Sequence, residues 1–502
     1  MANLQNYNGR YCESEYEYAF LSFLEEEGWQ YMSGNSIPRS TKSAVLYADD
    51  MEQFLCKTNA DLTADEIHQI IDKVRLAGAE SEFSTLHTVY GWMVDGVQFT
   101  PQNGCTRMIS LIDFENPESN IFRAVNQFAV EYTNNGMKET RRPDILLFVN
   151  GMPLCIIELK NPADDNATIY DAWEQINIRY WRDIPHLLHY CPLACISDGV
   201  KTRLGTVRTP YEHFYAWRRV NDGDKVSTLP FEETQTMIKG VYAPERFLEI
   251  FRDYIYFQDS EYDSDEREIV CRYPQFFAAR LLKQSIVKSV EAKSGKGGTY
   301  FGATGCGKTY TMAFLARQLA LRCPELGSPT VIMIVDRDEL QKQGAKLFTK
   351  SKEFLNLGEV CVVPNRNNLR EELRARESGG FYICTIQKFC DREDDKIGLI
   401  NNRANIICFS DEAHRTQLEH AKSLKFSKDA DENMRAMVSK PYAKVLKEAL
   451  PNATFVGFTG TPISETYQTF GDEIDRYTMD QAVADGLTVS IKYHPRIAKV
   501  LL

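Results

Sequence analysis

The chain has 502 residues, of which 43% are hydrophobic and 25% are charged, a composition that is ordinary for globular protein. Its length exceeds what one hydrophobic core supports, so we expect two to four domains. The net charge of −12 argues against polyanion binding by the whole surface but is compatible with a local basic groove.

The sequence contains no apolar run of about eighteen residues, so it predicts no transmembrane helix and no membrane partner. Its start lacks the charged and apolar regions of a signal peptide. The 13 cysteines include no C-x-x-C pair, which predicts reduced thiols and a cytoplasmic location. Cys191 and Cys195 lie near His186 and His189 in an apolar run, and we interpret them as buried thiols rather than metal ligands.

Taken in chain order, the first predicted element is a helix over residues 13–28, with an apolar face and Gly28 as its stop. Residues 51–77 predict two further helical segments with a break near residues 59–63. Residues 141–162 then read RRPDILLFVNGMPLCIIELKNP. Two apolar, strand-favouring runs flank Asn150-Gly151 in this stretch, which predicts a β-hairpin.

Three charged residues, Asp144, Glu158 and Lys160, stand at the open end of this hairpin. Two carboxylates can hold Mg²⁺, and a lysine two residues along the same strand face can orient water and steady negative charge. The arrangement suits phosphodiester hydrolysis. The alternative is that Asp144 caps a strand and that Glu158 and Lys160 are solvated edge charges.

Strand register separates these two interpretations. A simple two-residue turn pairs Asp144 with Ile157 and places Asp144 and Glu158 on opposite faces. A three-residue loop over residues 149–151 pairs Asp144 with Ile156 and places all three charges on one face. We therefore predict that loop or an equivalent β-bulge.

Beyond the hairpin, residues 170–181 predict a helix that contains Gln175, and residues 187–196 predict a strand. The acidic residues 258–268 predict a boundary between domains. A helix then follows over residues 272–290. Gln275, on this helix and shortly before a glycine-rich loop, is a candidate for reading the adenine edge of a nucleotide.

The glycine-rich loop, Gly302-Ala303-Thr304-Gly305-Cys306-Gly307-Lys308-Thr309, fits G-x-x-x-x-G-K-[ST] between a strand and a helix. Gly302, Gly305 and Gly307 let backbone N–H groups close around phosphate oxygens. Lys308 supplies a charge to the β- and γ-phosphates, and Thr309 offers its hydroxyl to Mg²⁺. The loop predicts a site for Mg²⁺ and ATP.

Four apolar strands follow the loop and alternate with helices, which predicts a parallel sheet with its ligands at the carboxyl ends of the strands. The predicted strands cover residues 330–335, 381–385, 405–410 and 454–458. We expect Asp411 to hold Mg²⁺ and Glu412 to polarise the attacking water. His414, Thr459 and Thr461 are candidates for coupling the nucleotide state to the rest of the motor.

Two resemblances arise from these motifs. Pro143-Asp144 with Glu158-Leu159-Lys160 resembles the PD-(D/E)xK nuclease motif. Nucleases of this fold often have a further acidic residue at the site, and Glu17, on the first predicted helix, matches its position. Some of these nucleases also carry a Q-x-x-x-Y helix, but Tyr180 lies one residue too far from Gln175, so we expect Gln175 alone at the site.

The second resemblance joins the two halves of the chain. The chain carries, in this order, the motifs GATGCGKT, VDRDEL, TIQKF, DEAH and GFTGTP. This order resembles the first RecA-like domain of superfamily 2 helicases and translocases. A PD-(D/E)xK nuclease placed before such a motor resembles the restriction (R) subunit of type I restriction–modification enzymes. The implied α/β architecture is a nuclease domain with a mixed sheet and flanking helices (residues 1–257), an acidic linker (258–270), a RecA-like domain with a parallel sheet (271–470) and a lead into a second motor domain (471–502).

This resemblance implies the partners and the reaction. The R subunit would work with methyltransferase and specificity subunits, pump duplex DNA with ATP and cut both strands far from the recognition site. S-adenosylmethionine would enter only through the methyltransferase subunit. No second RecA-like domain follows, so we expect a truncated R subunit that does not translocate alone. The alternatives are a DEAH helicase with a non-catalytic first domain and a degenerate ATP-binding scaffold.

Overall fold

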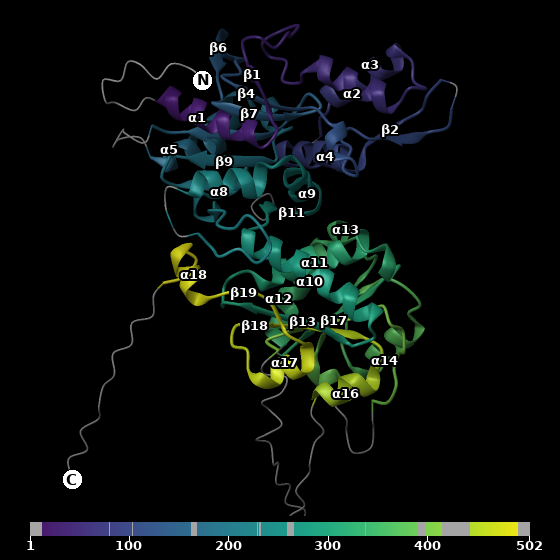
Figure 1. Cartoon of the computed structure of the whole chain (residues 1–502). Coiled ribbons are helices and arrows are strands. Elements are labelled where there is room, and N and C mark those ends of the chain that lie inside the picture. The colour runs from purple at the N-terminus through teal and green to yellow at the C-terminus, as the bar shows by residue number, and fades with distance from the viewer. Residues whose placement is uncertain are drawn as a thin grey trace, which may run out of the picture. The chain divides into compact units, whose positions relative to one another are not determined.

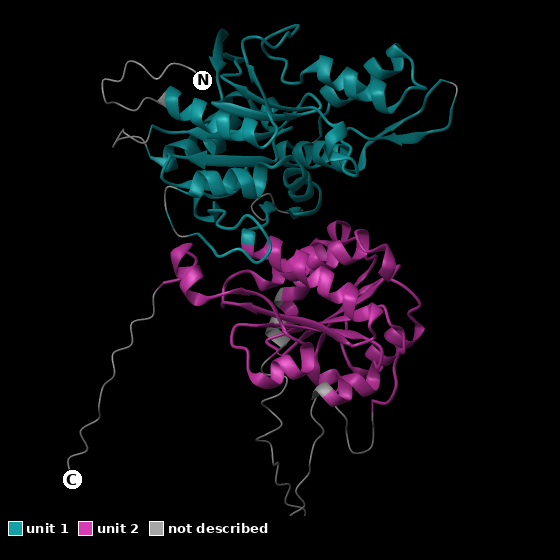
Figure 2. Ribbon diagram, viewed as in Figure 1, with its two compact units in different colours: residues 1–273 teal, residues 274–502 magenta. Residues whose placement is uncertain are grey.

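The computed structural model separates the chain into two compact units, residues 1–273 and 274–502 (Figure 2). The structure describes residues 13–79, 81–102, 104–161, 168–227, 229, 232–258, 266–336, 338–389, 397–413 and 442–489. His414 and residues 490–502 of the predicted lead segment lie outside these ranges. The domain limits given above stay predictions.

The first unit is built on a mixed six-stranded sheet with the order β1-β4-β7-β8-β9-β10 (Figure 1). β1 pairs with β4 and β8 pairs with β9 in parallel, whereas the other neighbours are antiparallel. Every residue of β7 and β8 is buried, which explains why both strands read as continuous apolar runs. The strands are β1 (Gln30–Ser33), β4 (Phe122–Asn126), β7 (Ile145–Val149), β8 (Met152–Leu159), β9 (Leu193–Ser197) and β10 (Thr202–Thr206).

Helices and three small two-stranded sheets surround this central sheet. The helices are α1 (Glu13–Glu26), α2 (Ala48–Thr58), α3 (Ala64–Arg75), α4 (Glu82–Asp95), α5 (Ile169–Glu174), the π-helix η2 (Gln175–Tyr180), α6 (Trp181–Asp183), α7 (Pro185–Leu188), α8 (Glu233–Met237), the π-helix η5 (Ile238–Tyr242) and α9 (Pro244–Asp253). The small sheets pair β2 (Val97–Phe99) with β3 (Arg107–Ile109), β5 (Val130–Asn134) with β6 (Met137–Arg141), and β11 (Ile255–Gln258) with β12 (Arg267–Val270).

Two sequence expectations are corrected in this unit. Residues 187–196 do not form one strand, because Pro185 starts the short helix α7 and the strand begins only at Leu193. Proline favours the first helical position, where its fixed φ suits the helix. Arg267–Val270, inside the predicted linker, forms β12 and pairs with β11 instead.

The second unit is a seven-stranded sheet with the order β15-β16-β14-β17-β18-β13-β19, in which all paired strands run parallel (Figure 1). The four strands predicted from the sequence are confirmed within one residue. The strands are β13 (Lys296–Gly302), β14 (Thr330–Val335), β15 (Val360–Val362), β16 (Phe381–Thr385), β17 (Ile406–Asp411), β18 (Thr454–Thr459) and β19 (Glu473–Tyr477).

Helices alternate with these strands, as a RecA-like α/β sheet requires. They are α10 (Tyr273–Glu291), α11 (Lys308–Leu321), α12 (Asp338–Lys350), α13 (Lys352–Leu355), α14 (Arg366–Ala375), α16 (Tyr442–Ala449), α17 (Ser464–Phe470) and α18 (Met479–Ala484). Within the described ranges, no helix is both long and apolar enough to cross a bilayer.

Candidate functional site

The β7–β8 hairpin has the register that brings its charged residues to one face. Asn150 and Gly151 form a two-residue turn with φ of 49° and 77°, and Val149 pairs with Met152. The register then shifts between Leu147 and Phe148, so that Ile145 pairs with Ile157. The β-bulge that we predicted is therefore confirmed, whereas the three-residue loop is not used. Continued by one residue, this register places Asp144 opposite Glu158.

The hairpin turn is held on two sides. The Asn150 side chain donates to Leu111 O at 3.0 Å and to Asn120 Oδ1 at 2.8 Å, and its Oδ1 accepts from Ile121 N at 2.8 Å. Gly151 leaves no room for a side chain, because a Cβ there would lie 2.1 Å from Tyr47 O. These contacts fix the turn and with it the register of the two strands.

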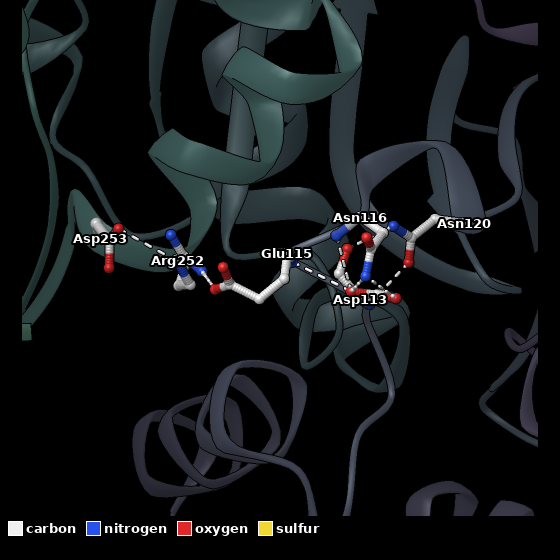
Figure 3. Close-up of polar contacts among 6 residues, drawn as sticks. All are labelled: Asp113, Glu115, Asn116, Asn120, Arg252 and Asp253. Carbon is white, nitrogen blue, oxygen red and sulfur yellow. Dashed lines mark hydrogen bonds and ion pairs between the residues drawn. The ribbon is translucent and has the colours of Figure 1, made fainter. Parts of the chain in front are cut away.

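The loop that contacts Asn150, residues 111–121, is itself held by hydrogen bonds and an ion pair, as Figure 3 shows. Asp113 Oδ1 accepts from the backbone N–H groups of Glu115 at 3.1 Å and Asn116 at 2.9 Å. Arg252, on α9, reaches Glu115 Oε1 at 2.8 Å and Asp253 Oδ2 at 3.2 Å. The Arg252–Glu115 ion pair therefore ties this loop to α9, whereas the Arg252–Asp253 pair lies within α9.

The two carboxylates lie together at the other end of the hairpin. Asp144 Oδ2 accepts from Leu159 N at 2.8 Å. Asp144 is 9% exposed and Glu158 is fully buried, so Glu158 is not a solvated edge charge. Burial and, second, the Asp144 carboxylate raise the pKa of Glu158 well above its usual value. A bound cation would favour the ionised form of both groups.

Gln175 and Tyr180 complete the surroundings of Glu158. Gln175 Nε2 donates to Glu158 Oε2 at 2.8 Å, and Tyr180 OH donates to Glu158 Oε1 at 2.8 Å. Lys160 Nζ donates to Gln175 Oε1 at 3.0 Å, so one amide links the lysine to the carboxylate. Gln175 thus lies beside Glu158 and Lys160, and its part in a nuclease site stays a prediction.

The expectation that Tyr180 lies away from the site is wrong. Residues Gln175–Tyr180 form a π-helix, in which the extra residue is taken up by a wider turn. Gln175 Nε2 and Tyr180 OH are consequently 2.7 Å apart. The spacing argument failed because it assumed α-helical geometry across the whole segment.

Glu17 joins this network through a residue that the sequence did not single out. Gln127 Nε2 donates to Glu17 Oε2 at 2.7 Å and lies 3.5 Å from Asp144 Oδ1. Asn126 Nδ2 donates to Glu17 Oε1 at 2.6 Å. Glu17 is 5% exposed, so it is not a solvated surface residue. Gln127 has a φ of 50°, and no residue pattern in the sequence indicates that conformation.

The donor set of this site fits a hard divalent cation. Asp144 and Glu158 offer carboxylate oxygens, which Mg²⁺ prefers, and Mg²⁺ binds through one or two carboxylates while it keeps several waters. Across the described part of the chain, no group of three or more His, Cys, Asp or Glu side chains is placed to share one ion. The arrangement therefore fits a two-carboxylate Mg²⁺ site better than a closed protein cage. Cys191 and Cys195 are fully buried, and burial raises the pKa of both thiols.

The second candidate site lies at the carboxyl ends of the parallel strands. Gly305 and Gly307 both have a φ of 84°, and α11 begins directly afterwards at Lys308. Gly302 ends β13, and Thr309 follows Lys308 in the first turn of α11. This strand–loop–helix geometry presents backbone N–H groups and the positive end of a helix dipole to an anion.

Two acidic residues at the end of β17, Asp411 and Glu412, lie near this loop. Lys308 Nζ donates to Gly302 O at 3.3 Å and lies 3.7 Å from Glu412 Oε1. Burial raises the pKa of Asp411 to about 6, a shift that Lys308 opposes and Glu412 supports. Glu412 has a φ of 49°, a conformation that is uncommon for a residue with a side chain and often marks a functional site.

The remaining predicted motor residues are placed as follows. Gln275 is 3% exposed, and its Nε2 lies 3.5 Å from Gly307 O, beside the phosphate loop. Thr459 is buried at the end of β18, and its hydroxyl accepts from Thr461 N at 3.1 Å. Both threonines therefore lie at the ligand edge of the sheet. His414 falls outside the described residues.

Comparison with known families matches the two units separately. Residues 10–213 match the model of the type I restriction enzyme R protein N terminus, and residues 274–502 match that of the SWI2/SNF2 ATPase. The fold class is thus a nuclease-type mixed α/β domain joined to a RecA-like ATPase domain. Both matches agree with the resemblance to the R subunits of type I restriction enzymes noted in the sequence, which is thereby confirmed.

Individual relatives agree with this assignment. The chain is 32% identical over 501 residues to the type I restriction enzyme HindI endonuclease subunit of Haemophilus influenzae, covering 96% of this chain and 46% of that protein. It is 31% identical over 445 residues to a Methanocaldococcus jannaschii protein named for the type I restriction enzyme MjaIXP endonuclease subunit, covering 82% and 39%. The chain thus spans less than half the length of these curated relatives.

Among solved structures, the chain is similar to a fragment assigned to an HsdR subunit of a type I restriction enzyme from Vibrio vulnificus YJ016. The two share 15% identity, with a TM-score of 0.26 over 72% of this chain and 56% of that one. At that score the fold assignment rests on the strand orders described above.

Proposed function

We propose that this chain supplies the DNA-cutting and ATP-driven functions of a type I restriction enzyme. The observation that carries the proposal is the convergence of Asp144, Glu158 and Lys160 at the open end of one buried hairpin, where Gln175 links Glu158 to Lys160. The similarity of the chain to R proteins supports the same conclusion. The substrate would be duplex DNA, cut in both strands away from the recognition site.

In the proposed reaction, Asp144 and Glu158 would hold Mg²⁺, and the ion would supply Lewis-acid stabilisation of the phosphodiester and a nucleophile at neutral pH. Gln175 and Tyr180 hold the Glu158 carboxylate in one orientation by two hydrogen bonds. Lys160 orients the attacking water and stabilises the negative charge that develops on the phosphate. Gln127 contacts Asp144, and Glu17 holds the Gln127 side chain in that position.

In the second unit, the proposed ATP site uses the phosphate loop and the ends of β17 and β18. Gly302, Gly305, Gly307 and Lys308 would bind the phosphates, and Thr309 with Asp411 would hold Mg²⁺. Glu412 would orient the attacking water. Gln275 would read the adenine edge. The nucleotide state would be transmitted to the rest of the motor by Thr459, Thr461 and His414.

ATP hydrolysis in this unit would drive translocation of duplex DNA. We further propose that the protein acts in a complex with methyltransferase and specificity subunits, and that S-adenosylmethionine is required only by the methyltransferase subunit. The relatives are named as endonuclease subunits, which supports a role within a complex.

The test uses the full-length protein in its assembled restriction complex. Glu158→Ala and Lys160→Ala should each abolish DNA cleavage while DNA-stimulated ATP hydrolysis is retained. Lys308→Ala should abolish ATP hydrolysis. Cleavage that survives both substitutions in the first unit would show that the first unit is not the nuclease.

A further inference from the structure

We propose that the β5–β6 hairpin is a DNA-groove ribbon that inserts into duplex DNA beside the nuclease site. The inference rests on the proposed nuclease function and adds a substrate-positioning surface to it. β5 and β6 form a two-stranded sheet of their own, apart from the central strands (Figure 1). The chain passes from Gln127 into β5 and returns from β6 to Asp144, so both ends of the ribbon lie at the catalytic carboxylates.

The base of the ribbon is held rigidly. Gln127 N donates to Asp144 O at 3.0 Å and closes the two ends of the ribbon against each other. Arg141 pairs with Asp183 at 2.6 Å, and its guanidinium lies 5.3 Å from the centre of the Tyr132 ring. A rigid base matters because a substrate contact made at the tip then fixes the position of the DNA relative to Asp144.

The tip of the ribbon carries side chains that suit a DNA groove. Asn135 and Gly136 form a two-residue turn with φ of 48° and 79°, and Asn134 pairs with Met137. Met137 is 68% exposed, and the Lys138 side chain is 81% exposed. Amides and lysine read or contact the minor groove, and an exposed methionine can wedge between base steps.

The two faces of the ribbon carry different side chains, one suited to bases and the other to the phosphates of a groove wall. The register places Met137 on the same face as Tyr132 and Lys138 on the same face as Thr133. Lys138 and the exposed Arg142 can therefore contact phosphates of one wall while Met137 faces the bases. Five residues of strand extend roughly 17 Å, enough to reach from the carboxylates into an adjacent groove.

The acidic residues of the ribbon are engaged within it. Glu139 accepts from Tyr132 OH at 2.6 Å and from Asn134 Nδ2 at 2.8 Å. Glu131 lies 3.4 Å from Lys138 Nζ, an exposed pair that a phosphate can replace. A protein partner is the weaker alternative, because a tip with one exposed apolar side chain buries far less than the roughly 1,000 Å² of a stable protein interface.

The experiment measures binding of the 502-residue chain to a 30-base-pair duplex over a range of salt concentrations. Lys138→Ala should lower the slope of log affinity against log salt by about one, as expected for loss of one phosphate contact. Met137→Ala with Lys138→Ala should weaken binding roughly tenfold at low salt. A duplex with 2-aminopurine in place of adenine should gain fluorescence with the parent chain and lose that gain with Met137→Ala, because the wedge unstacks the base.

Met108→Ala is the matched control, because Met108 is a 54% exposed methionine on another of the small two-stranded sheets, β2–β3. It should leave the salt slope and the fluorescence unchanged. Equal effects of Met108→Ala and Met137→Ala, or no effect of the ribbon variants, would overturn the proposal. So would unchanged duplex binding with loss of assembly into the restriction complex, which would assign the ribbon to a protein partner. If Glu158→Ala abolishes cleavage while the ribbon variants bind normally, the ribbon proposal alone fails.

Discussion

Tyr180 donates its hydroxyl to Glu158 Oε1 over 2.8 Å, although five residues separate Tyr180 from Gln175, which donates to the other oxygen of the same carboxylate. The π-helix between them allows both donors to reach one buried group. In π-helical segments an inserted residue is accommodated without loss of the flanking helix, and such segments are frequent at functional sites.

Tyr180→Phe tests whether this contact tunes the nuclease site. The hydroxyl lowers the pKa of Glu158, so its loss should raise that pKa further. Because the ionised carboxylate is the form that holds a cation, the rise of cleavage with pH should move to higher pH. At neutral pH we expect a loss of roughly 10- to 100-fold, the range for a hydrogen bond to a charged group.

Tyr170→Phe is the control for this measurement, because Tyr170 lies on the adjoining helix α5 and is 47% exposed. Its pH–cleavage profile should match that of the parent. A Tyr180→Phe profile that falls uniformly, without a shift in pH, would indicate a packing role for the tyrosine rather than control of Glu158.

Glu158→Gln tests the burial of the carboxylate through protein stability. The folded-state pKa of Glu158 lies above its usual value, so the folded chain holds a proton that the unfolded chain releases. Folding stability of the parent should therefore fall as pH rises from the ordinary carboxyl pKa toward the raised one. Glutamine does not titrate, so the Tm of Glu158→Gln minus that of the parent should increase with pH in metal-free buffer. A difference that is constant from pH 4 to 9 would contradict the burial of an ionisable Glu158.

Gly151→Ala tests the lock on the hairpin turn. Gly151 and Gly136 both have positive φ, 77° and 79°, and both follow an asparagine in a two-residue turn. A Cβ at Gly151 would lie 2.1 Å from Tyr47 O, whereas nothing lies within 4 Å of one at Gly136. Gly136→Ala should cost about 1 kcal/mol of unfolding free energy from the left-handed conformation alone. Gly151→Ala should cost about 2–4 kcal/mol, because backbone must also move.

Urea unfolding of the two alanine variants checks this comparison. Gly151→Ala should also reduce cleavage, because the register of β7 and β8 places Asp144 and Glu158 together. Equal losses of stability in the two variants would show that the Tyr47 contact does not hold the turn.

Lys308→Ala and Glu412→Gln separate nucleotide binding from hydrolysis in the second unit. Lys308 lies 3.7 Å from Glu412, so the phosphates must compete with this carboxylate for the lysine. Lys308→Ala should lose nucleotide binding, whereas Glu412→Gln should bind nucleotide at least as tightly as the parent and fail to hydrolyse it. Fluorescent-nucleotide anisotropy and phosphate release measure the two steps. Normal hydrolysis by Glu412→Gln would remove Glu412 from the proposed catalytic role.

The sequence predicted much of this architecture for physical reasons. Buried parallel strands read as continuous apolar runs, so β14, β16, β17 and β18 could be placed within one residue. The bulge in the β7–β8 hairpin followed from a parity argument, because only a shifted register puts Asp144 and Glu158 on one face.

The parts that the sequence did not predict depend on backbone geometry and long-range contacts. Tyr180 was excluded because residue spacing does not distinguish a π-helix from an α-helix. Gln127 was missed because its positive φ and its contacts with Glu17 and Asp144 join residues distant in the sequence. β12 was assigned to a linker because its four residues overlap the end of the acid-dominated stretch 258–268.

The central claim is that Asp144 and Glu158 form a cation site in the first unit, independent of the ATP site in the second. Calorimetric titration of Mn²⁺ into the nucleotide-free chain tests it most directly, with Glu158→Gln and Asp411→Asn as the paired variants. We predict a binding event that Glu158→Gln abolishes and Asp411→Asn retains. Binding that survives Glu158→Gln, or that disappears with Asp411→Asn alone, would contradict the assignment.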